Sequence, residues 1–535
     1  MNFNPDSREY PSARSVVYAR NGMVCTGQPL AAQAGLDVLK RGGNAVDAAV
    51  ATAAALTVLE PTANGIGGDA FALVWKDGRL YGLNASGPAP KALSLAALAR
   101  QDPPLIAKHG WEPVTVPGAP SAWFALSRRF GALPFADLLE AAVRYARDGY
   151  PVSPVCARYW GKAHAAYSVA LKDDMFREWF RVFAPAGHAP RAGSLWSSPE
   201  HAATLAELAD TACESFYRGR VAGVIDAHSR ATGGFLRASD LAAFQPEWVE
   251  PVGVDFMGHR VWEIPPNGQG LVALMALAML DADNLAGLPP DQAAHLQIEA
   301  LKLAFADAAA YVAEPGAMPF GADSLLDPGY LAERRSLIGQ CALVPAAGSP
   351  DRGGTVYLAT ADANGCMVSY IQSNYMGFGS GIVVPGTGIA LHNRGHNFST
   401  RAGHPNMLEP GKRPYHTIIP GFLTKDDAAV GPFGVMGGFM QPQGHLQVLV
   451  HALKHGRNPQ EALDAPRFQW TQGLAVQVEA DYDSSLVEAL LARGHDITVE
   501  RDAGTFGRGQ IIWRDGTGVL CGATEKRTDG CVAAF

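Results

Sequence analysis

The sequence predicts one intermeshed unit of α-helices and β-strands, an α+β protein, and three features predict it. Residues before about 350 show mostly helical periodicity, and residues after about 355 alternate mostly as strands do. No internal repeat, low-complexity segment or long linker separates the two parts. With 535 residues, of which 48% are hydrophobic and 18% charged, the chain can bury a large core.

The composition excludes several classes of partner. A formal net charge of −8 leaves no basic excess for phosphates, so we expect no nucleic-acid partner. The most apolar stretch, residues 44–61, carries Asp47 and is shorter than the roughly 20 residues of a membrane span, so we expect no membrane partner. The seven cysteines form no C-x-x-C pair, and the N-terminus shows no secretion signal, which favours a cytoplasmic location.

Two helices and a strand pair are predicted near the start of the chain. In "PLAAQAGLDVLKRGGNAVDAAVATAAALTVLEP" the first helix ends at Gly42-Gly43 and Asn44 caps the second, with Asp47 in its first turn. The following "GGDAFALVWKDGRLYGLNASG" alternates as a β-hairpin does, with "KDG" at its turn. We therefore expect a strand pair directly after the helices.

The later elements follow the same periodicities. From about 135 to 340 the pattern is largely helical, with apolar residues recurring at spacings of three and four. "TVYLATADANGCMVSYIQSN" and residues 507–526 are each predicted as hairpins. Between them, residues 441–456 are predicted as an amphipathic helix that follows a Gly-Gly turn.

The motifs of several common enzyme classes are missing. The sequence has no nucleophile elbow, no phosphate-binding glycine loop, no dinucleotide-binding glycine motif and no H-E-x-x-H. A group of histidines suggests a metal site as an alternative. Because no cysteine or paired carboxylate accompanies these histidines, we expect no metal. The group consists of His392, His396, His404 and His416.

The tripeptide Gly353-Gly354-Thr355 opens the strand-rich part and suggests a nucleophile. The glycines leave the carbonyl before Thr355 accessible. A threonine at a chain N-terminus carries its own base, an α-amine that titrates near about 8. The Thr355 hydroxyl would then cut its own preceding peptide bond. From the residues alone, a β-branched residue at the start of a strand is the simpler explanation.

Four motifs, in order, resemble the γ-glutamyltransferase family of N-terminal-nucleophile hydrolases over essentially the whole chain. They are "GGNAVDAAVATAAALTVLEPTANGIGGDAF", "FGSGIVVPGTGIALHNRGHNFS", "PGKRPYHTIIP" and "GVMGGFMQPQGH". The resemblance implies a four-layer αββα sandwich formed by two chains from one precursor. It implies a mostly helical large subunit, 1–354, that adds strands to the sandwich, and a small subunit, 355–535, that begins with Thr355. No cofactor is implied.

The resemblance also assigns catalytic residues. Thr355 matches the family's nucleophile, released by cleavage between Gly354 and Thr355. Gly437 and Gly438 match the pair whose backbone N–H groups form the oxyanion hole, and the helix after them would add its positive dipole end. Ser373 matches a hydroxyl residue that contacts the nucleophile. A simple turn and plain strand packing remain the alternatives for the glycines and for Ser373.

Substrate recognition departs from the family's pattern. The loss of an acidic residue removes the preference for an α-ammonium group, and a new arginine adds a cation. The nucleophile strand begins Thr-Val-Tyr where transferases often have Thr-Thr-His, which favours hydrolysis over transfer. The changed positions are Ser94 for an arginine, Tyr375 for an asparagine, Arg394 for a glutamine, Asn397 for an acidic residue and His416 for a serine, whereas Thr417 keeps a hydroxyl.

We therefore expect hydrolysis of a small carboxylate-bearing amide such as oxamate, through an acyl-threonine intermediate. Arg394 and His416 are candidate carboxylate ligands, with a structural ion pair as the alternative for Arg394. A γ-glutamyltransferase or glutathione hydrolase is the alternative activity, and a metal hydrolase or an unprocessed binding protein are rivals from other classes. The expected partners are the amide substrate and the two subunits of one precursor, with a homodimer of heterodimers left open.

Overall fold

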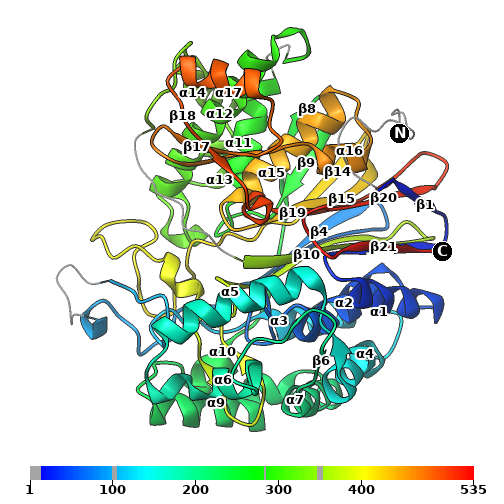
Figure 1. Ribbon diagram of the computed structural model, residues 1–535, viewed down its shortest axis with the longest axis vertical. Helices are drawn as coiled ribbons and strands as arrows, with labels where there is room; N and C mark the ends of the chain where they lie inside the picture. The colour runs from blue at the N-terminus through cyan, green and yellow to red at the C-terminus, as the bar shows by residue number, and fades with distance from the viewer. Residues whose placement is uncertain (1–13, 99–104, 282–284, 346–353) are drawn as a thin grey trace.

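The computed structural model describes residues 14–98, 105–281, 285–345 and 354–535 (Figure 1). Two seven-stranded sheets lie face to face at the centre, and helices cover both outer faces. This arrangement confirms the four-layer αββα sandwich. Gly353 and the polar loop before it, residues 346–353, lie outside the described residues.

The first sheet carries the strand that begins at the proposed cleavage site. Its neighbouring strands pair antiparallel throughout. β2, from before Thr355, lies between β21 and β10 from after it, and β11 pairs with β3, so the two parts of the chain are interleaved as expected. The order is β21 (Cys531–Ala534), β2 (Gly22–Thr26), β10 (Gly354–Asp362), β11 (Met367–Tyr375), β3 (Asp69–Lys76), β4 (Arg79–Ala85) and β7 (Glu247–Val249).

The second sheet packs its inner face against β10 and β11. Close approach depends in part on Gly434, because a Cβ there would lie 2.5 Å from the Tyr357 ring. The order is β1 (Val17–Ala19), β20 (Leu520–Thr524), β19 (Arg508–Arg514), β15 (Ala428–Met436), β14 (Gly421–Lys425), β9 (His259–Glu263) and β8 (Val252–Phe256).

Helices of the first half cover the first sheet, in blue to green at the bottom of Figure 1. The helix α2 (Ala45–Leu59) is buried along all 15 residues. Smaller strand pairs lie beside them, β5 (Tyr150–Pro151) with β6 (Leu195–Trp196) and β12 (Val383–Val384) with β13 (Ile389–Ala390). The other helices are α1 (Pro29–Lys40), α3 (Ala119–Phe130), α4 (Phe135–Asp148), α5 (Pro154–Ala170), α6 (Arg177–Phe183), α7 (Pro199–Asp210), α8 (Glu214–Arg218), α9 (Arg220–Ala231) and α10 (Ala238–Ala243).

The second sheet is covered by helices from both parts of the chain, at the top of Figure 1. A three-stranded sheet of β16 (Phe468–Gln472), β17 (Ala475–Glu479) and β18 (Asp496–Glu500) lies on the same side. Within the described residues, no helix is both long and apolar enough to cross a membrane. The helices are α11 (Gly270–Asp281), α12 (Pro290–Tyr311), α13 (Ala322–Leu325), α14 (Pro328–Ser336), α15 (Met440–Leu449), α16 (Pro459–Asp464) and α17 (Ser484–Ala492).

The local sequence signals are largely confirmed. The three predicted hairpins form as β3–β4, β10–β11 and β19–β20. The helix predicted for 441–456 is α15 followed by a π-helical turn, Val450–Lys454. The region from 135 to 340 was expected to be largely helical but also contains the β8–β9 hairpin, whose Met257-Gly258 turn has φ values of +52° and +72°.

The capping of α2 gives the first testable prediction. Asn44 Oδ1 accepts hydrogen bonds from the backbone N–H groups of Val46 and Asp47, and the Asp47 carboxylate accepts from the Asn44 N–H. Asn44→Ala removes the cap, so we expect it to lower the free energy of unfolding by about 1 kcal/mol. The shift in denaturation midpoint measures the loss. The exposed Asn21→Ala is the matched control, and equal midpoints for the two variants would contradict the prediction.

Candidate functional site

Thr355 is buried near the start of β10, opposite the end of β11. Its Oγ1 lies 3.1 Å from Ser373 Oγ, and Gln441 Nε2 donates to it over 3.4 Å. The pairing of β10 with β11 is shifted between Gly354 and Val356, and such irregularities re-aim side chains beside active sites. The structure thus brings the predicted Thr355 and Ser373 into contact.

The predicted glycine pair lies between β15 and α15. The Gly437 carbonyl accepts from Met440 N over 3.1 Å, so the peptide's trans geometry directs the Gly438 N–H away from the helix. The φ values of +142° and +61° favour glycine at both positions. The arrangement matches an anion site at a helix N-terminus, in which a free backbone N–H and the helix dipole act together.

Two glutamines tie this turn to Thr355 and to the loop at 415–419. Gln269 Nε2 donates to the carbonyls of Thr417 over 2.6 Å and Gly438 over 2.9 Å. Gln441 Oε1 accepts a hydrogen bond from the Ile419 N–H over 3.0 Å, while its Nε2 donates to Thr355 Oγ1. All these side chains are fully or almost fully buried, so the hydrogen bonds fix their relative positions.

Arg394 is the buried cation of the site. It has no exposed surface, its Nη1 donates to Thr417 Oγ1 over 2.7 Å, and its guanidinium lies 4.3 Å from the centre of the Tyr375 ring. Burial lowers the pKa of Arg394 to about 10, so it stays charged at neutral pH. Among the described residues, its Nε and Nη2 have no hydrogen-bond partner. Two donors on a buried guanidinium suit a carboxylate.

Asp69 is the anion nearest to Arg394, with its Oδ2 4.0 Å from Arg394 Nε. Complete burial raises the pKa of Asp69 to about 7, and the charge of Arg394 opposes this increase. The same oxygen lies 2.9 Å from His416 Nε2 and 3.4 Å from His392 Nδ1. Asp69 therefore organises several polar side chains around one buried oxygen.

His416 has a different role from the one predicted. Its Nδ1 accepts from the Ile418 N–H over 3.3 Å, so the proton is on Nε2, which donates to Asp69. Burial, and then the charge of Arg394, lowers the pKa of His416 well below its usual range. A neutral ring with both nitrogens occupied is not a carboxylate ligand, so His416 positions Asp69 instead.

The remaining predicted binding residues divide into near and distant positions. Tyr375 pairs with Gly354 across the strands and has a φ of +72°, a strained value for a tyrosine. Asn397 Nδ2 donates to the Tyr415 carbonyl and so braces the loop. Ser94 accepts from the Ala97 N–H at the start of a 3₁₀ turn, Ala96–Leu98. Of these residues, Tyr375 places its ring against the Arg394 guanidinium.

The four histidines considered as metal ligands are not brought together as one set. His396 contacts the Ile106 carbonyl and His404 the Ala309 carbonyl, at 2.9 and 3.0 Å. His392 contacts the Thr115 carbonyl at 3.0 Å, while His416 contacts Asp69. Each of the four histidines therefore hydrogen-bonds to a protein group, and three of them to backbone carbonyls.

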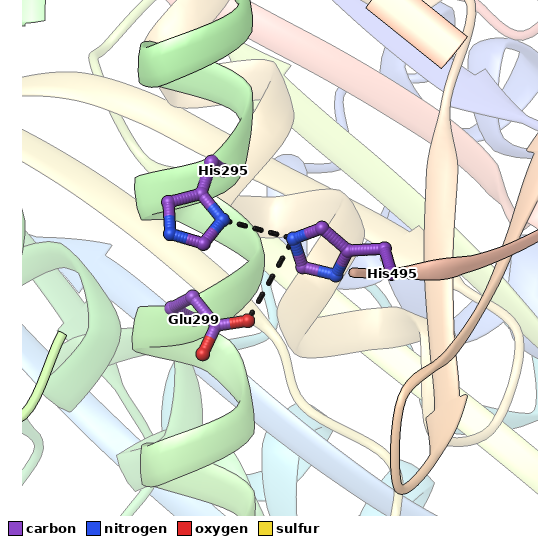
Figure 2. A group of neighbouring side chains, drawn as sticks. All are labelled: His295, Glu299 and His495. Atoms are coloured by element: carbon purple, nitrogen blue, oxygen red, sulfur yellow. Dashed lines mark hydrogen bonds and ion pairs between the residues drawn. The ribbon is translucent and has the colours of Figure 1, made fainter. Parts of the chain in front are cut away.

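A different group on α12 has ligand atoms close enough for one metal ion. Figure 2 shows His295 and Glu299 on the helix, with His495 reaching them from just before β18. Lys302 already supplies a cation, because its Nζ donates to Glu299 Oε1 over 2.7 Å and contacts His495 Nδ1 at 3.4 Å. Glu299 Oε2 also accepts from the Leu343 N–H, and Lys302 Nζ donates to the Leu343 carbonyl. The group therefore anchors the chain at Leu343.

Asp69, Gln269 and Gln441 are the site residues that sequence analysis missed. Asp69 and Gln441 lie inside two of the quoted motifs, each directly or closely after a glycine pair. The usable signal was a polar residue placed close after a glycine pair inside a quoted motif. Gln269 lies in "NGQG", and its role depends on contacts with residues about 150 positions away.

Comparisons with known proteins agree with this geometry. A family model described as Gamma-glutamyltranspeptidase matches residues 31–535. The oxamate amidohydrolase proenzyme of Klebsiella pneumoniae is 34% identical over 531 residues, covering 96% of this chain and 98% of that protein. The glutathione hydrolase-like YwrD proenzyme of Bacillus subtilis is 34% identical over 527 residues, with coverage of 96% and 98%.

A solved structure matches along the whole chain. The crystal structure of cephalosporin acylase from Bacillus halodurans is 58% identical, with a TM-score of 0.96. The match covers 100% of this chain and 99% of that one.

The environment of His416 gives a second prediction. Because burial and Arg394 lower its pKa, the ring should stay neutral and protonated on Nε2 from about pH 5 to about pH 8. Nitrogen NMR shifts of the ring, assigned by their loss in His416→Gln, measure this state. Conversion to the imidazolium within that range would contradict the assigned hydrogen bonds.

Proposed function

The chain belongs to the gamma-glutamyltranspeptidase family and is an amide hydrolase of the N-terminal-nucleophile type, and from that premise we propose its substrate and its working residues. It is a self-cleaving N-terminal-threonine amidohydrolase that acts on a small amide with a carboxylate on its acyl side, such as oxamate. The observation that most directly supports this proposal is the buried guanidinium of Arg394. Its Nε and Nη2 have no hydrogen-bond partner among the described residues.

The charge balance supports an anionic acyl group. A cation without surface exposure is costly unless it is paired, and the nearest described carboxylate oxygen, on Asp69, is 4.0 Å from Nε. With the Asp69 pKa raised to about 7, that oxygen compensates the charge only partly at neutral pH. A substrate carboxylate completes the pairing, and the Tyr375 ring and Thr417 Oγ1 hold the guanidinium plane.

The proposed reaction uses Thr355 twice. Cleavage between Gly354 and Thr355 divides the chain into a large subunit, 1–354, and a small subunit, 355–535, that begins with a free α-amine. The new α-amine then takes the proton of the Thr355 hydroxyl, and Oγ attacks the substrate's amide carbonyl. The Gly437 and Gly438 N–H groups stabilise the oxyanion, and ammonia or an amine leaves. Water hydrolyses the acyl-threonine ester and releases the acid.

The same residues disfavour a γ-glutamyl substrate. Ser94 supplies no cation for an α-carboxylate, and the amide of Asn397 is engaged with Tyr415, so neither position offers the charge that an amino acid head group needs. A second candidate is the removal of a dicarboxylic acyl chain from a cephalosporin, favoured by the 58% identity to the cephalosporin acylase. Both candidates place a carboxylate on the acyl side, and they differ in acyl length.

The nucleophile gives the third prediction. Thr355→Ala removes the only hydroxyl that can attack the preceding carbonyl in this scheme. We expect it to remain one chain of 56.5 kDa on a denaturing gel and to have no turnover. Thr355→Ser should still cleave, and the exposed Thr517→Ala is the matched control. Two chains from Thr355→Ala would exclude self-cleavage by this residue.

The arginine gives the fourth prediction. We expect wild-type protein to release ammonia from oxamate and not from glutamine. Arg394→Lys should lower kcat/KM on oxamate about 100-fold, which corresponds to about 3 kcal/mol for a buried charge-assisted pair. The exposed Arg401→Lys is the matched control, and gel analysis checks that both variants are cleaved.

The panel of substrates separates the candidates. Activity on glutamine that survives in Arg394→Lys would restore the γ-glutamyl alternative. Activity on a dicarboxylic acyl cephalosporin that falls in Arg394→Lys, without activity on oxamate, would select the second candidate.

A further inference from the structure

The first cleavage of the chain lacks the base that the mature protein uses. Before cleavage, the Thr355 nitrogen is part of the Gly354–Thr355 peptide bond, so no free α-amine exists. The two side chains that contact the Thr355 hydroxyl, Ser373 and Gln441, carry no group that titrates near neutral pH. Self-cleavage therefore requires a different proton acceptor.

A small cavity lies beside Thr355, and Thr355 forms part of its wall. Glu60, Arg508, Gln510, Gly27 and Thr528 line it as well. The space available to the centre of a water molecule is about 10 Å³, close to the volume that one buried water needs. The cavity thus joins the nucleophile's surroundings to a carboxyl group that the proposed reaction does not use.

The lining is polar enough to hold a water molecule. Among the described residues, Arg508 Nε and Gln510 Oε1 are buried without a hydrogen-bond partner. A water offers both a donor and an acceptor, so it can satisfy a nitrogen donor and a carbonyl oxygen together.

Glu60 is held in place by the elements around it. It lies at the C-terminal end of α2 and is 4% exposed, and its Oε1 accepts from Arg508 Nη1 over 2.9 Å. Burial raises the pKa of Glu60 to about 7, with Arg508 opposing the increase and Asp529 adding to it. Tyr150, Cys156 and Tyr357, which lie near Glu60 or line the same cavity, have pKa values raised by burial and stay uncharged. Glu60 is thus ready to accept a proton near neutral pH.

We propose that Glu60 is the proton acceptor for self-cleavage of the intact chain, acting on the Thr355 hydroxyl through one water in this cavity. The inference rests on the proposed function, since it concerns how the nucleophile is released. It assigns Glu60 to maturation alone, because the α-amine serves as the base once cleavage is complete.

The proposed self-cleavage balances in protons and electrons. The Oγ electron pair forms a bond to the Gly354 carbonyl carbon while the hydroxyl proton passes through the water to Glu60. The C–N bond then breaks, and Glu60 returns the proton through the water to the Thr355 nitrogen. A second water hydrolyses the Gly354–Thr355 ester, leaving a Gly354 carboxylate and a Thr355 with free amine and hydroxyl. The net reaction consumes one water.

The test follows the conversion of newly translated full-length chain into two chains, across a range of pH. For wild type, the cleavage rate should rise about tenfold per pH unit below about 7 and then level off, because Glu60 must be ionised. Glu60→Gln should cleave at least about tenfold more slowly and lose this pH dependence, and Glu60→Asp should recover part of the rate.

A second variant avoids leaving Arg508 without its partner. Gly27→Ala keeps the Glu60–Arg508 pair but places a Cβ 3.2 Å from Glu60 Oε2 and 3.2 Å from Thr528 Oγ1, inside the space for the water. We expect slow cleavage from this variant as well. Gly223→Ala, whose Cβ would meet no atom within 4 Å, is the matched control.

The outcomes separate this inference from the proposed function. After long incubation, Glu60→Gln should have normal turnover of oxamate per cleaved molecule. Wild-type cleavage rates and pH dependence in both Glu60→Gln and Gly27→Ala would overturn the role of Glu60 and leave the proposed function intact. A loss of turnover equal to the loss of cleavage rate would also overturn it, whereas cleavage of Thr355→Ala would overturn the proposed function itself.

Discussion

The antiparallel pairing of β10 with β11 is the constraint on which the site depends. It holds Thr355 opposite the end of β11, where Ser373 touches its hydroxyl and Tyr375 pairs with Gly354. The strands on either side, β2 and β3, come from the first half of the chain, so this pairing lies in the middle of a sheet built by both parts. The nucleophile's position is therefore a property of the complete fold.

Buried charge is the second organising feature. Arg394 with Asp69, and Arg508 with Glu60, are arginine–carboxyl pairs in nearly closed surroundings. Desolvation raises the pKa of each carboxyl to about 7, and each arginine limits the increase. Such pairs are costly to bury and rarely add net stability. Their presence fits the roles proposed above, in which Arg394 meets an anionic substrate and Glu60 accepts a proton.

The sequence correctly predicted the structural features that depend on residues close together in the chain. The Asn44 cap, the "KDG" turn and the hairpin after Thr355 are local signals, and each formed as expected. The motifs supplied Thr355, Ser373 and Arg394, which the structure brings into one connected network. The roles of Gln269 and Glu60, and the neutral state of His416, depend on partners more than a hundred positions away or on complete burial. Periodicity and spacing carry no information on such contacts, and the β8–β9 hairpin was missed because its short strands lie among long helical segments.

The interleaved sheet also bears on the proposed cleavage, because strands from the first part of the chain pair on either side of β10 and β11. β10 pairs with β2 and β11 pairs with β3, and neither pairing depends on the Gly354–Thr355 bond that we propose is cut. Upstream of the cut, Leu343 is held by Glu299 and Lys302, and Ala342 donates to the Arg493 carbonyl over 2.7 Å. The described residues on both sides of the proposed cut are thus anchored to the rest of the fold. In the proposed scheme the new α-amine therefore forms on an anchored strand, beside the cavity that Glu60 lines. The base proposed for maturation can then be replaced by the base proposed for turnover without rearranging the fold.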